Sequence, residues 1–184
     1  MQLTNLPDHL PAPKDDGLSD HLYGRQWPPG SLLGTNQEWV NLAQIHNYVV
    51  VYVYPMTGRP DVPLPEGWDD IPGARGCTPQ SCSFRDHYAQ LQQLHAHVFG
   101  LSVQANAYQI EAQQRLHLPF ELLSDNQLTL KSALHLPTFE VASMELYKRI
   151  TLILKQGRIC KVFYPVFPSS ENASEVLEWL KSQD

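Results

Sequence analysis

Two cysteines, Cys77 and Cys82, stand five residues apart in the stretch RGCTPQSCSFRD. The stretch also predicts the start of a helix, because Thr78 is a good N-cap, Pro79 suits the first helical position and Phe84 begins an apolar stripe. On such a helix Cys77 would lie at the buried edge of the first turn, and Cys82 on the wetter face. A pair of thiols around a capped helix N-terminus, after a Pro- and Gly-rich loop and a buried strand, favours reactive cysteines over two inert ones.

The expected helix also says what chemistry the pair could do. At a helix N-terminus the free backbone N–H groups and the dipole favour a thiolate at Cys77, and such positions lower a cysteine pKa to ~3.5–7.5. Arg75, two residues away, acts in the same direction. Helical positions i and i+5 are roughly 8–9 Å apart at Cα, whereas a disulfide needs ~7 Å or less. The folded helix should therefore keep Cys77 available to an oxidant, and a Cys77–Cys82 disulfide should require the first turn to unwind.

Other candidate sites are weaker. Cys160 lies among apolar residues in RICKVFY and is expected to be a buried strand thiol. Cys77, Cys82, His87 and a histidine of LHAHVFG could be combined into a zinc set, but the two cysteines diverge around the helix. No serine-centred nucleophile motif appears.

The composition excludes several classes of protein. The chain has 184 residues, enough for one domain with a core, and a formal charge of −6, which argues against binding nucleic acid or an anionic membrane. The longest apolar run, 48–54, is too short to span a bilayer, and the first residues do not resemble a secretory signal. An odd cysteine count argues against a disulfide framework and for a cytoplasmic protein.

Strand and helix patterns alternate along the chain, which predicts an α/β fold with a central mixed sheet flanked by helices. Residues 1–35, rich in Pro, Gly and Asp, are interpreted as an irregular arm packed on a domain of residues 36–184. The expected elements are a short strand and helix at 38–45, strands at 48–54, 97–103 and 120–125, a hairpin at 149–165 turning at Gln156-Gly157, and helices at 78–94, 106–118 (capped by Asn106), 126–136 and 172–183 (with Asn172 and Glu175 as a capping box). The Pro- and Gly-rich segment 56–76 is predicted to be a long functional or mobile loop.

Several of these segments resemble the peroxiredoxins, specifically the bacterioferritin-comigratory (Q-type) group of the AhpC/TSA superfamily. The segment GCTPQSCSFRD resembles that group's peroxidatic-cysteine segment, and VVVYVYP, LPFELLSD and KRITLIL resemble its strands in the expected order. The resemblance extends from about Glu38 to the C-terminus. It implies a thioredoxin-like fold and a thiol peroxidase of the atypical two-cysteine kind, acting on hydrogen peroxide or organic hydroperoxides.

The resemblance also implies roles for single residues. Cys77 would be the peroxidatic cysteine and Cys82 the resolving cysteine, while Arg149 matches the family arginine that holds the thiolate and the peroxide. The family usually has Pro seven residues and Thr or Ser three residues before the peroxidatic cysteine, where this chain has Asp70 and Ala74. Thr57, in YPMTG, is the candidate for the missing hydroxyl, if the extra residues of the loop follow it.

The expected partners are a peroxide substrate and a thioredoxin-like dithiol reductant, with no metal, flavin or haem cofactor, and the expected assembly is a monomer or weak homodimer. A second interpretation stays open at this point. On the same fold the chain could be a non-catalytic redox sensor or binding module with a disulfide switch, because Ala74 leaves out the hydroxyl that the family uses.

Overall fold

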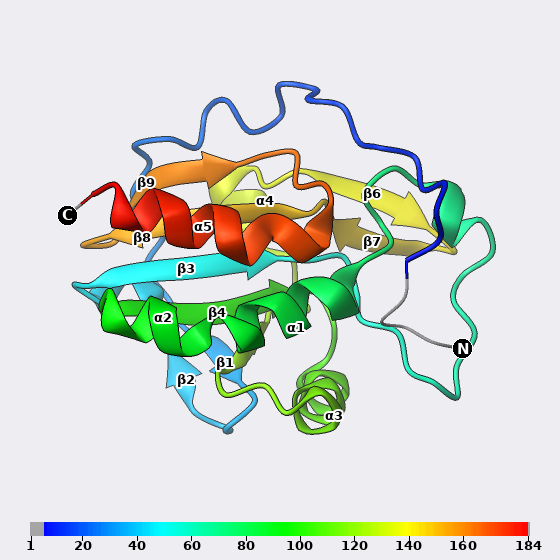
Figure 1. The fold of residues 1–184 in the computed structure, drawn as a ribbon, viewed down its shortest axis with the longest axis horizontal. Helices are drawn as coiled ribbons and strands as arrows, with labels where there is room; N and C mark the ends of the chain where they lie inside the picture. Colours follow the sequence, from blue (N-terminus) through cyan, green and yellow to red (C-terminus); the bar gives the residue numbers. More distant parts are fainter. Residues whose placement is uncertain (1–5, 184) are drawn as a thin grey trace.

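A seven-stranded sheet runs through the centre of the molecule (Figure 1). The computed structural model describes residues 6–183. The strand order is β2-β1-β5-β4-β3-β8-β9, with β3–β4 and β4–β5 parallel and the other pairs antiparallel. The strands are β1 (Leu32–Gly34), β2 (Trp39–Val40), β3 (Tyr48–Val53), β4 (Ala96–Ser102), β5 (Leu122–Ser124), β8 (Ile150–Lys155) and β9 (Arg158–Phe163).

Helices cover both faces of this sheet, as the alternating pattern predicts. Apolar residues of α1, α2, α3 and α5 form one core with the sheet, and α4 and the N-terminal arm form a second core on the opposite face (Figure 1). The α-helices are α1 (Cys77–Asp86), α2 (Tyr88–Gln93), α3 (Asn106–Leu116), α4 (Thr129–Leu134) and α5 (Asn172–Lys181), and short 3-10 helices are η1 (Leu42–Gln44), η2 (Trp68–Asp70) and η3 (Ser169–Glu171). The prediction of a central mixed sheet flanked by helices is confirmed.

The position of β3 between two layers of helices explains why the sequence YVVVYVY has no polar face. Val50 and Tyr52 point into the core under α1 and α5, whereas Val49, Val51 and Val53 point into the core under α4. All five are fully buried. A strand between two helical layers needs apolar residues at every position, and its C-terminal end leads into the loop that precedes α1.

Two pieces of sheet were not predicted from the sequence. Strand β1 begins at Leu32, inside the segment assigned to the irregular arm, and pairs with β5. A separate hairpin of β6 (Thr138–Val141) and β7 (Met144–Tyr147) turns at Ala142-Ser143, both with positive φ. Ala and Ser rarely occupy that conformation, so the turn lacks the usual Gly or Asn signal. The predicted hairpin turn at Gln156-Gly157 is present, with φ of 51° and 71°.

The predicted single helix 78–94 is wrong at its start and in its middle. Helix α1 begins at Cys77 after Gly76, so Thr78 is not the N-cap. His87 separates α1 from α2, although bonds from His87 N to Ser83 O and from Leu91 N to His87 O, each 3.1 Å, continue across the junction. The His87 ring nitrogen Nδ1 lies 2.8 Å from the same Ser83 carbonyl and competes for it.

Two other predicted caps are also wrong. Asn106 is the first residue of α3, and its side chain bonds to the Gly34 carbonyl instead of capping the helix. Asn172 is the first residue of α5 and is fully buried, with no capping bond from its side chain. In both cases the asparagine side chain hydrogen-bonds to residues far away in the chain and not to the first turn of its own helix.

The described part of the N-terminal arm, residues 6–31, has no helix or strand and runs along the molecule at the top of Figure 1. Leu22 and Trp27 bury their side chains in the core under α4, and Gln26 makes a bridge to Arg158 of β9. The division into an arm of 1–35 and a domain of 36–184 stays a prediction, and residues 1–5 of that arm lie outside the described residues. No helix within residues 6–183 is long and apolar enough to cross a membrane.

Asp125 is predicted to be a main source of stability. Its buried carboxylate accepts hydrogen bonds from the backbone N–H groups of Thr129 (2.9 Å) and Leu130 (3.0 Å) and from the hydroxyls of Thr129 (2.6 Å) and Tyr147 (2.7 Å). Burial and the Asp125 carboxylate raise the pKa of Tyr147, which therefore keeps its proton and donates. Asp125→Ala should lower the free energy of unfolding by about 2–4 kcal/mol, because it leaves these donors unpaired. Denaturant unfolding measures this, and the exposed neighbour variant Asn126→Ala should change the free energy by less than about 0.5 kcal/mol.

Candidate active site

Cys77 is the first residue of α1 and lies inside the molecule. Its side chain is only 4% exposed, and Gly76 before it has a φ of +111°. Ser169 of η3 donates a 2.8 Å hydrogen bond to the Gly76 carbonyl, and a Cβ at position 76 would approach Ser169 Oγ to 2.3 Å. Both the backbone conformation and the close approach of Ser169 therefore require glycine at position 76. The backbone held in this way determines the position of Cys77 at the start of α1.

The guanidinium of Arg149 reaches the Cys77 sulfur. Arg149 Nη2 is 3.2 Å from Cys77 Sγ and 3.0 Å from the Ala74 carbonyl oxygen, while Nε donates to the Gly73 carbonyl at 3.3 Å. The structure thus brings together the residues immediately before α1 and an arginine that lies 72 positions later in the chain. The rigid fork of an arginine can hold several acceptors at once in this way.

Arg149 is a buried cation with no acidic partner. It is 4% exposed, and none of the ion pairs among residues 6–183 includes it. Its hydrogen-bond partners are carbonyls, one amide oxygen and the sulfur of Cys77. A buried charge is costly unless it is paired, and Cys77 is the ionisable side chain that this guanidinium contacts.

Arg75, which the sequence analysis placed beside Cys77 for the same purpose, is engaged elsewhere. Its guanidinium pairs with Asp69 at 3.0 Å, and its side chain is 9% exposed. The expectation that Arg75 supplies the positive charge at Cys77 is therefore wrong. The cation in contact with the sulfur is Arg149.

A buried network of neutral side chains, which the sequence analysis missed, supports Arg149. Gln80 accepts a hydrogen bond from Arg149 Nη1 and donates one of 3.0 Å to Asn172 Oδ1, which also accepts from Thr151 Oγ1 at 2.7 Å. Gln80, Asn172 and Thr151 are fully buried. The sequence offers only a weak signal for this network: Gln80 follows Cys77 by one helical turn, and Asn172 stands in a pattern typical of a helix cap.

Cys82 lies further along α1 in a half-buried position and packs against the core under α1 and α5. Burial raises the pKa of its thiol, with Arg85 acting in the opposite direction and Asp86 in the same one. Cys77, Cys82 and Cys160 are all free thiols. Because α1 is continuous from Cys77 to Asp86, the two helix cysteines are held at the ~8–9 Å Cα separation of positions i and i+5.

Thr57 is fully buried, and its hydrogen bonds are made with Gln104. Its hydroxyl and backbone N–H both bond to Gln104 Oε1, at 3.1 and 2.9 Å, and its carbonyl accepts from Gln104 Nε2 at 3.1 Å. Its neighbours Met56 and Gly58 line a very small cavity of about 10 Å³ beside Cys77. A role for the Thr57 hydroxyl at the peroxide stays a prediction that these contacts do not support.

The weaker candidates of the sequence analysis do not come together. Cys160, in β9, is half-buried and its thiol donates to the Ile153 carbonyl across the hairpin. Burial raises its pKa. Within residues 6–183 no group of three or more His, Cys, Asp or Glu side chains is placed to hold a metal ion, so the alternative zinc set is not assembled there.

Sequence comparison relates this chain to proteins of one family. Residues 23–177 match the model of the Redoxin family. Peroxiredoxin Bcp of Bacillus subtilis is 28% identical over 163 residues, which are 86% of this chain and 94% of that protein. The chloroplastic peroxiredoxin Q of Oryza sativa is 30% identical over 73% of this chain, and the chain spans 54% of its length.

Solved structures agree on the fold. The peroxidoxin BcpB of Mycobacterium tuberculosis has a TM-score of 0.72 at 20% identity, over 88% of this chain and 97% of that one. A cysteine mutant of the Xylella fastidiosa PrxQ has a TM-score of 0.68 at 19% identity and covers 97% of this chain and 99% of that one. The predicted thioredoxin-like fold is confirmed by this likeness.

Proposed function

This chain belongs to the redoxin family, as a peroxiredoxin of the bacterioferritin-comigratory (Q) type, and from that membership we propose that Cys77 is its peroxidatic cysteine, Cys82 its resolving cysteine and Arg149 the residue that activates both sulfur and peroxide. A peroxiredoxin is a thiol peroxidase. One observation carries the assignment: a buried guanidinium, with no carboxylate partner among residues 6–183, lies 3.2 Å from the sulfur of Cys77.

In the first step the Cys77 thiolate attacks one oxygen of the peroxide. A sulfur–oxygen bond forms, the O–O bond breaks, and the other oxygen leaves as an alcohol or water after taking a proton, so that Cys77 becomes a sulfenic acid. Arg149 stabilises the thiolate beforehand and the negative charge on the leaving oxygen during the reaction. Because its fork is held by Gln80 and by the carbonyls of Gly73 and Ala74, little reorganisation is needed as the charge moves.

In the second step Cys82 attacks the sulfur of the Cys77 sulfenic acid. A sulfur–sulfur bond forms and the hydroxyl leaves as water with the proton of Cys82. The folded α1 holds the two residues too far apart for this bond, so the first turn must open. Opening also exposes the Cys82 thiol, whose pKa is raised by burial in the folded helix, and so makes its reactive thiolate more accessible at neutral pH.

The cycle closes when a dithiol reductant breaks the Cys77–Cys82 disulfide by exchange and returns two protons and two electrons to the enzyme. We propose a thioredoxin-like protein for this role. The bacterioferritin comigratory protein of Xanthomonas campestris has been studied for alkyl peroxide reduction, and we propose organic hydroperoxides as substrates here as well as hydrogen peroxide. A cytoplasmic location and a monomer or weak homodimer remain predictions.

Steady-state turnover tests the proposed function. With a thioredoxin system as reductant, the wild-type protein should consume many equivalents of peroxide, and Cys82→Ser should lose turnover with this reductant while still consuming about one equivalent in a single turnover. Consumption of one equivalent by the wild-type protein, followed by arrest in the presence of active reductant, would instead favour the redox-sensor interpretation.

Hydrogen exchange tests the unwinding of α1. The amides from Gln80 to Asp86 should be protected in the reduced protein, because they bond within α1, and should exchange quickly once the Cys77–Cys82 disulfide forms. The amides of α5 serve as the internal reference and should change little. Unchanged exchange in α1, in a sample whose disulfide is confirmed by mass spectrometry, would contradict the proposed opening.

A further inference from the structure

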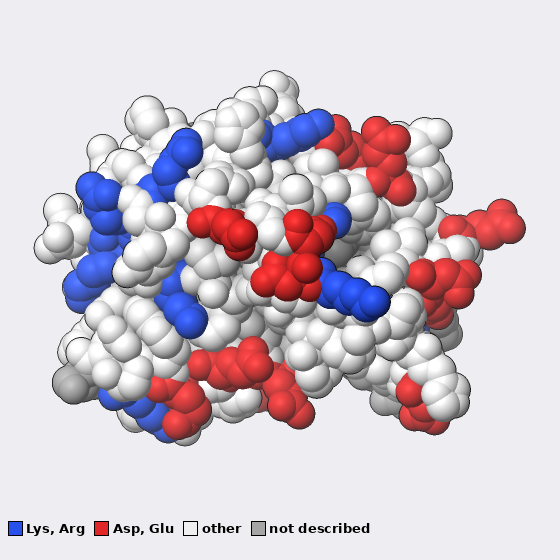
Figure 2. All heavy atoms as spheres, turned by 90° about the horizontal axis from the view of Figure 1, so that it is seen from above, with Lys and Arg blue, Asp and Glu red and all other residues white. Residues whose placement is uncertain are grey.

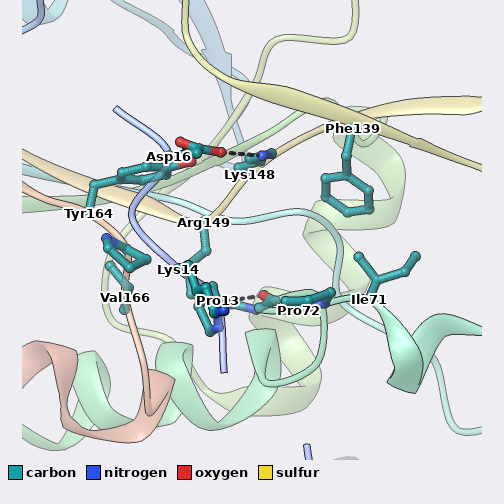
Figure 3. A pocket seen from close by; sticks show the side chains of 12 residues that line it. Pro13, Lys14, Asp16, Ile71, Pro72, Phe139, Lys148, Arg149, Tyr164 and Val166 are labelled. Atoms are coloured by element: carbon teal, nitrogen blue, oxygen red, sulfur yellow. Dashed lines mark hydrogen bonds and ion pairs between the residues drawn. The ribbon is translucent and has the colours of Figure 1, made fainter. Parts of the chain in front are cut away.

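A second cavity, of about 290 Å³, lies beside Arg149 (Figure 3). Its lining includes Arg149 and Gly73 of the active site but neither Cys77 nor Cys82. Its other walls come from distant segments: Pro13, Lys14 and Asp16 of the N-terminal arm, the loop before α1, Phe139 of β6 and the segment before α5. We call it the arm cavity. None of the steps proposed for the peroxidase uses it.

The arm cavity carries an excess of positive charge. Lys14, Lys148 and Arg149 line it, and Asp16 is its single carboxylate. Asp16 is already engaged, because it accepts from Lys148 Nζ at 2.7 Å and from the Tyr164 hydroxyl at 2.8 Å (Figure 3). The excess contrasts with the net charge of −6 of the chain, and Figure 2 shows both Asp and Glu and Lys and Arg side chains on the face that the arm crosses.

One of these positive charges, that of Arg149, already has a role in the proposed mechanism. Arg149 faces the Cys77 thiolate, and Lys148 is paired with Asp16, so Lys14 is the cation of the lining that has no counter-charge in it. The cavity is therefore suited to a ligand with a single negative charge. A phosphate dianion would bring one charge too many and would need donors on several sides.

Much of the remaining lining is apolar. Ile71, Pro72, Phe139 and Val166 form its walls (Figure 3). Its volume is at the lower end of the range of cavities that hold small molecules, which is roughly 300–1,000 Å³. Such a cavity fits a compact aliphatic or aromatic group, and a long acyl chain would not be enclosed.

We propose that the arm cavity binds a small monocarboxylic acid, with its carboxylate at Lys14 and its aliphatic or aromatic body against Phe139 and Ile71. Binding would also report on the redox state. Arg149 and Gly73 both line the cavity and are joined by a 3.3 Å hydrogen bond, and Gly73 lies four residues before Cys77. Opening α1 must disturb this wall, so the acid should bind the reduced form more tightly and, by reciprocity, oppose disulfide formation. This second part rests on the proposed function.

Titration of the reduced, isotope-labelled full chain by NMR tests the site, with phenylacetate as probe and 2-phenylethanol as its uncharged counterpart. Phenylacetate should shift the amides of Ile71, Gly73, Lys148 and Val166 saturably, with a Kd of about 1 mM or tighter, and the alcohol should bind at least about tenfold more weakly. Lys14→Ala should weaken phenylacetate about fivefold or more, whereas Lys161→Ala, on β9, should not. No saturable shift at these amides, or equal binding of acid and alcohol, would overturn the site.

The same titration on the Cys77–Cys82 oxidised protein tests the coupling. Phenylacetate should bind this form about tenfold more weakly, and at saturation it should shift the Cys77–Cys82 thiol–disulfide equilibrium against a reference dithiol by a similar factor toward the reduced form. Equal affinity for the two redox forms would overturn the coupling. Because binding to the reduced chain is measured without peroxide, a failure of the proposed peroxidase cycle would appear as absence of the disulfide, independently of whether the acid binds.

Discussion

Replacement of Cys77 by serine is expected to abolish peroxide reduction, with a fall of at least about 10³-fold in the second-order rate constant, because a serine hydroxyl cannot supply the thiolate nucleophile at neutral pH. Stopped-flow measurement of peroxide consumption by the reduced protein gives this constant. A reagent that traps sulfenic acid identifies which cysteine is oxidised. In Cys82→Ser treated with one equivalent of peroxide, the trap should label Cys77, because resolution is blocked there.

The third cysteine provides the matched control. Cys160→Ser removes a half-buried thiol that hydrogen-bonds within the β8–β9 hairpin, and it should leave the rate constant within about twofold of wild type. Label found chiefly on Cys82 or Cys160 of the single variants would show that Cys77 is not the peroxidatic cysteine.

Replacement of Arg149 by glutamine is expected to slow the reaction with peroxide by about 10²–10³-fold. The physical reason is the loss of a preorganised positive charge from a dry site, where one such contact contributes roughly 2–4 kcal/mol to the barrier. The rate constant of Arg149→Lys should lie between those of the wild-type protein and Arg149→Gln. Lysine keeps the charge but cannot contact the sulfur, Gln80 and the carbonyls of Gly73 and Ala74 at the same time. The rate constant is again measured with the reduced proteins.

Arg158→Gln is the control for the loss of one arginine, since Arg158 is exposed on β9 and donates to the Gly24 carbonyl. Its rate constant should equal that of the wild-type protein. Circular dichroism and the unfolding midpoint of Arg149→Gln separate a local loss of charge from a loss of fold. A folded Arg149→Gln protein that reacts within twofold of wild type would remove Arg149 from the mechanism.

The sequence by itself predicted the parts of this protein that depend on local pattern. The uninterrupted apolar run of β3, the presence of a helix at Cys82 and the Gln156-Gly157 hairpin were all predicted, because hydrophobic periodicity and turn chemistry act over a few residues. The same locality explains the failures. Hairpin β6–β7 turns at Ala142-Ser143 without a turn signal, and the cap predicted at Asn172 loses its side chain to Gln80 and Thr151.

The tertiary structure alone decided how charge is arranged around the cysteine. The resemblance named Arg149, but only the fold brings it 3.2 Å from the Cys77 sulfur across 72 positions of the chain and gives it the neutral partner Gln80. Among the described residues no carboxylate pairs with it. The fold likewise turns Arg75 toward Asp69 and ties Thr57 to Gln104. Contacts between residues far apart in the chain are set by how the layers pack, and in a buried site the polar partners of a group determine its charge, which no local pattern encodes.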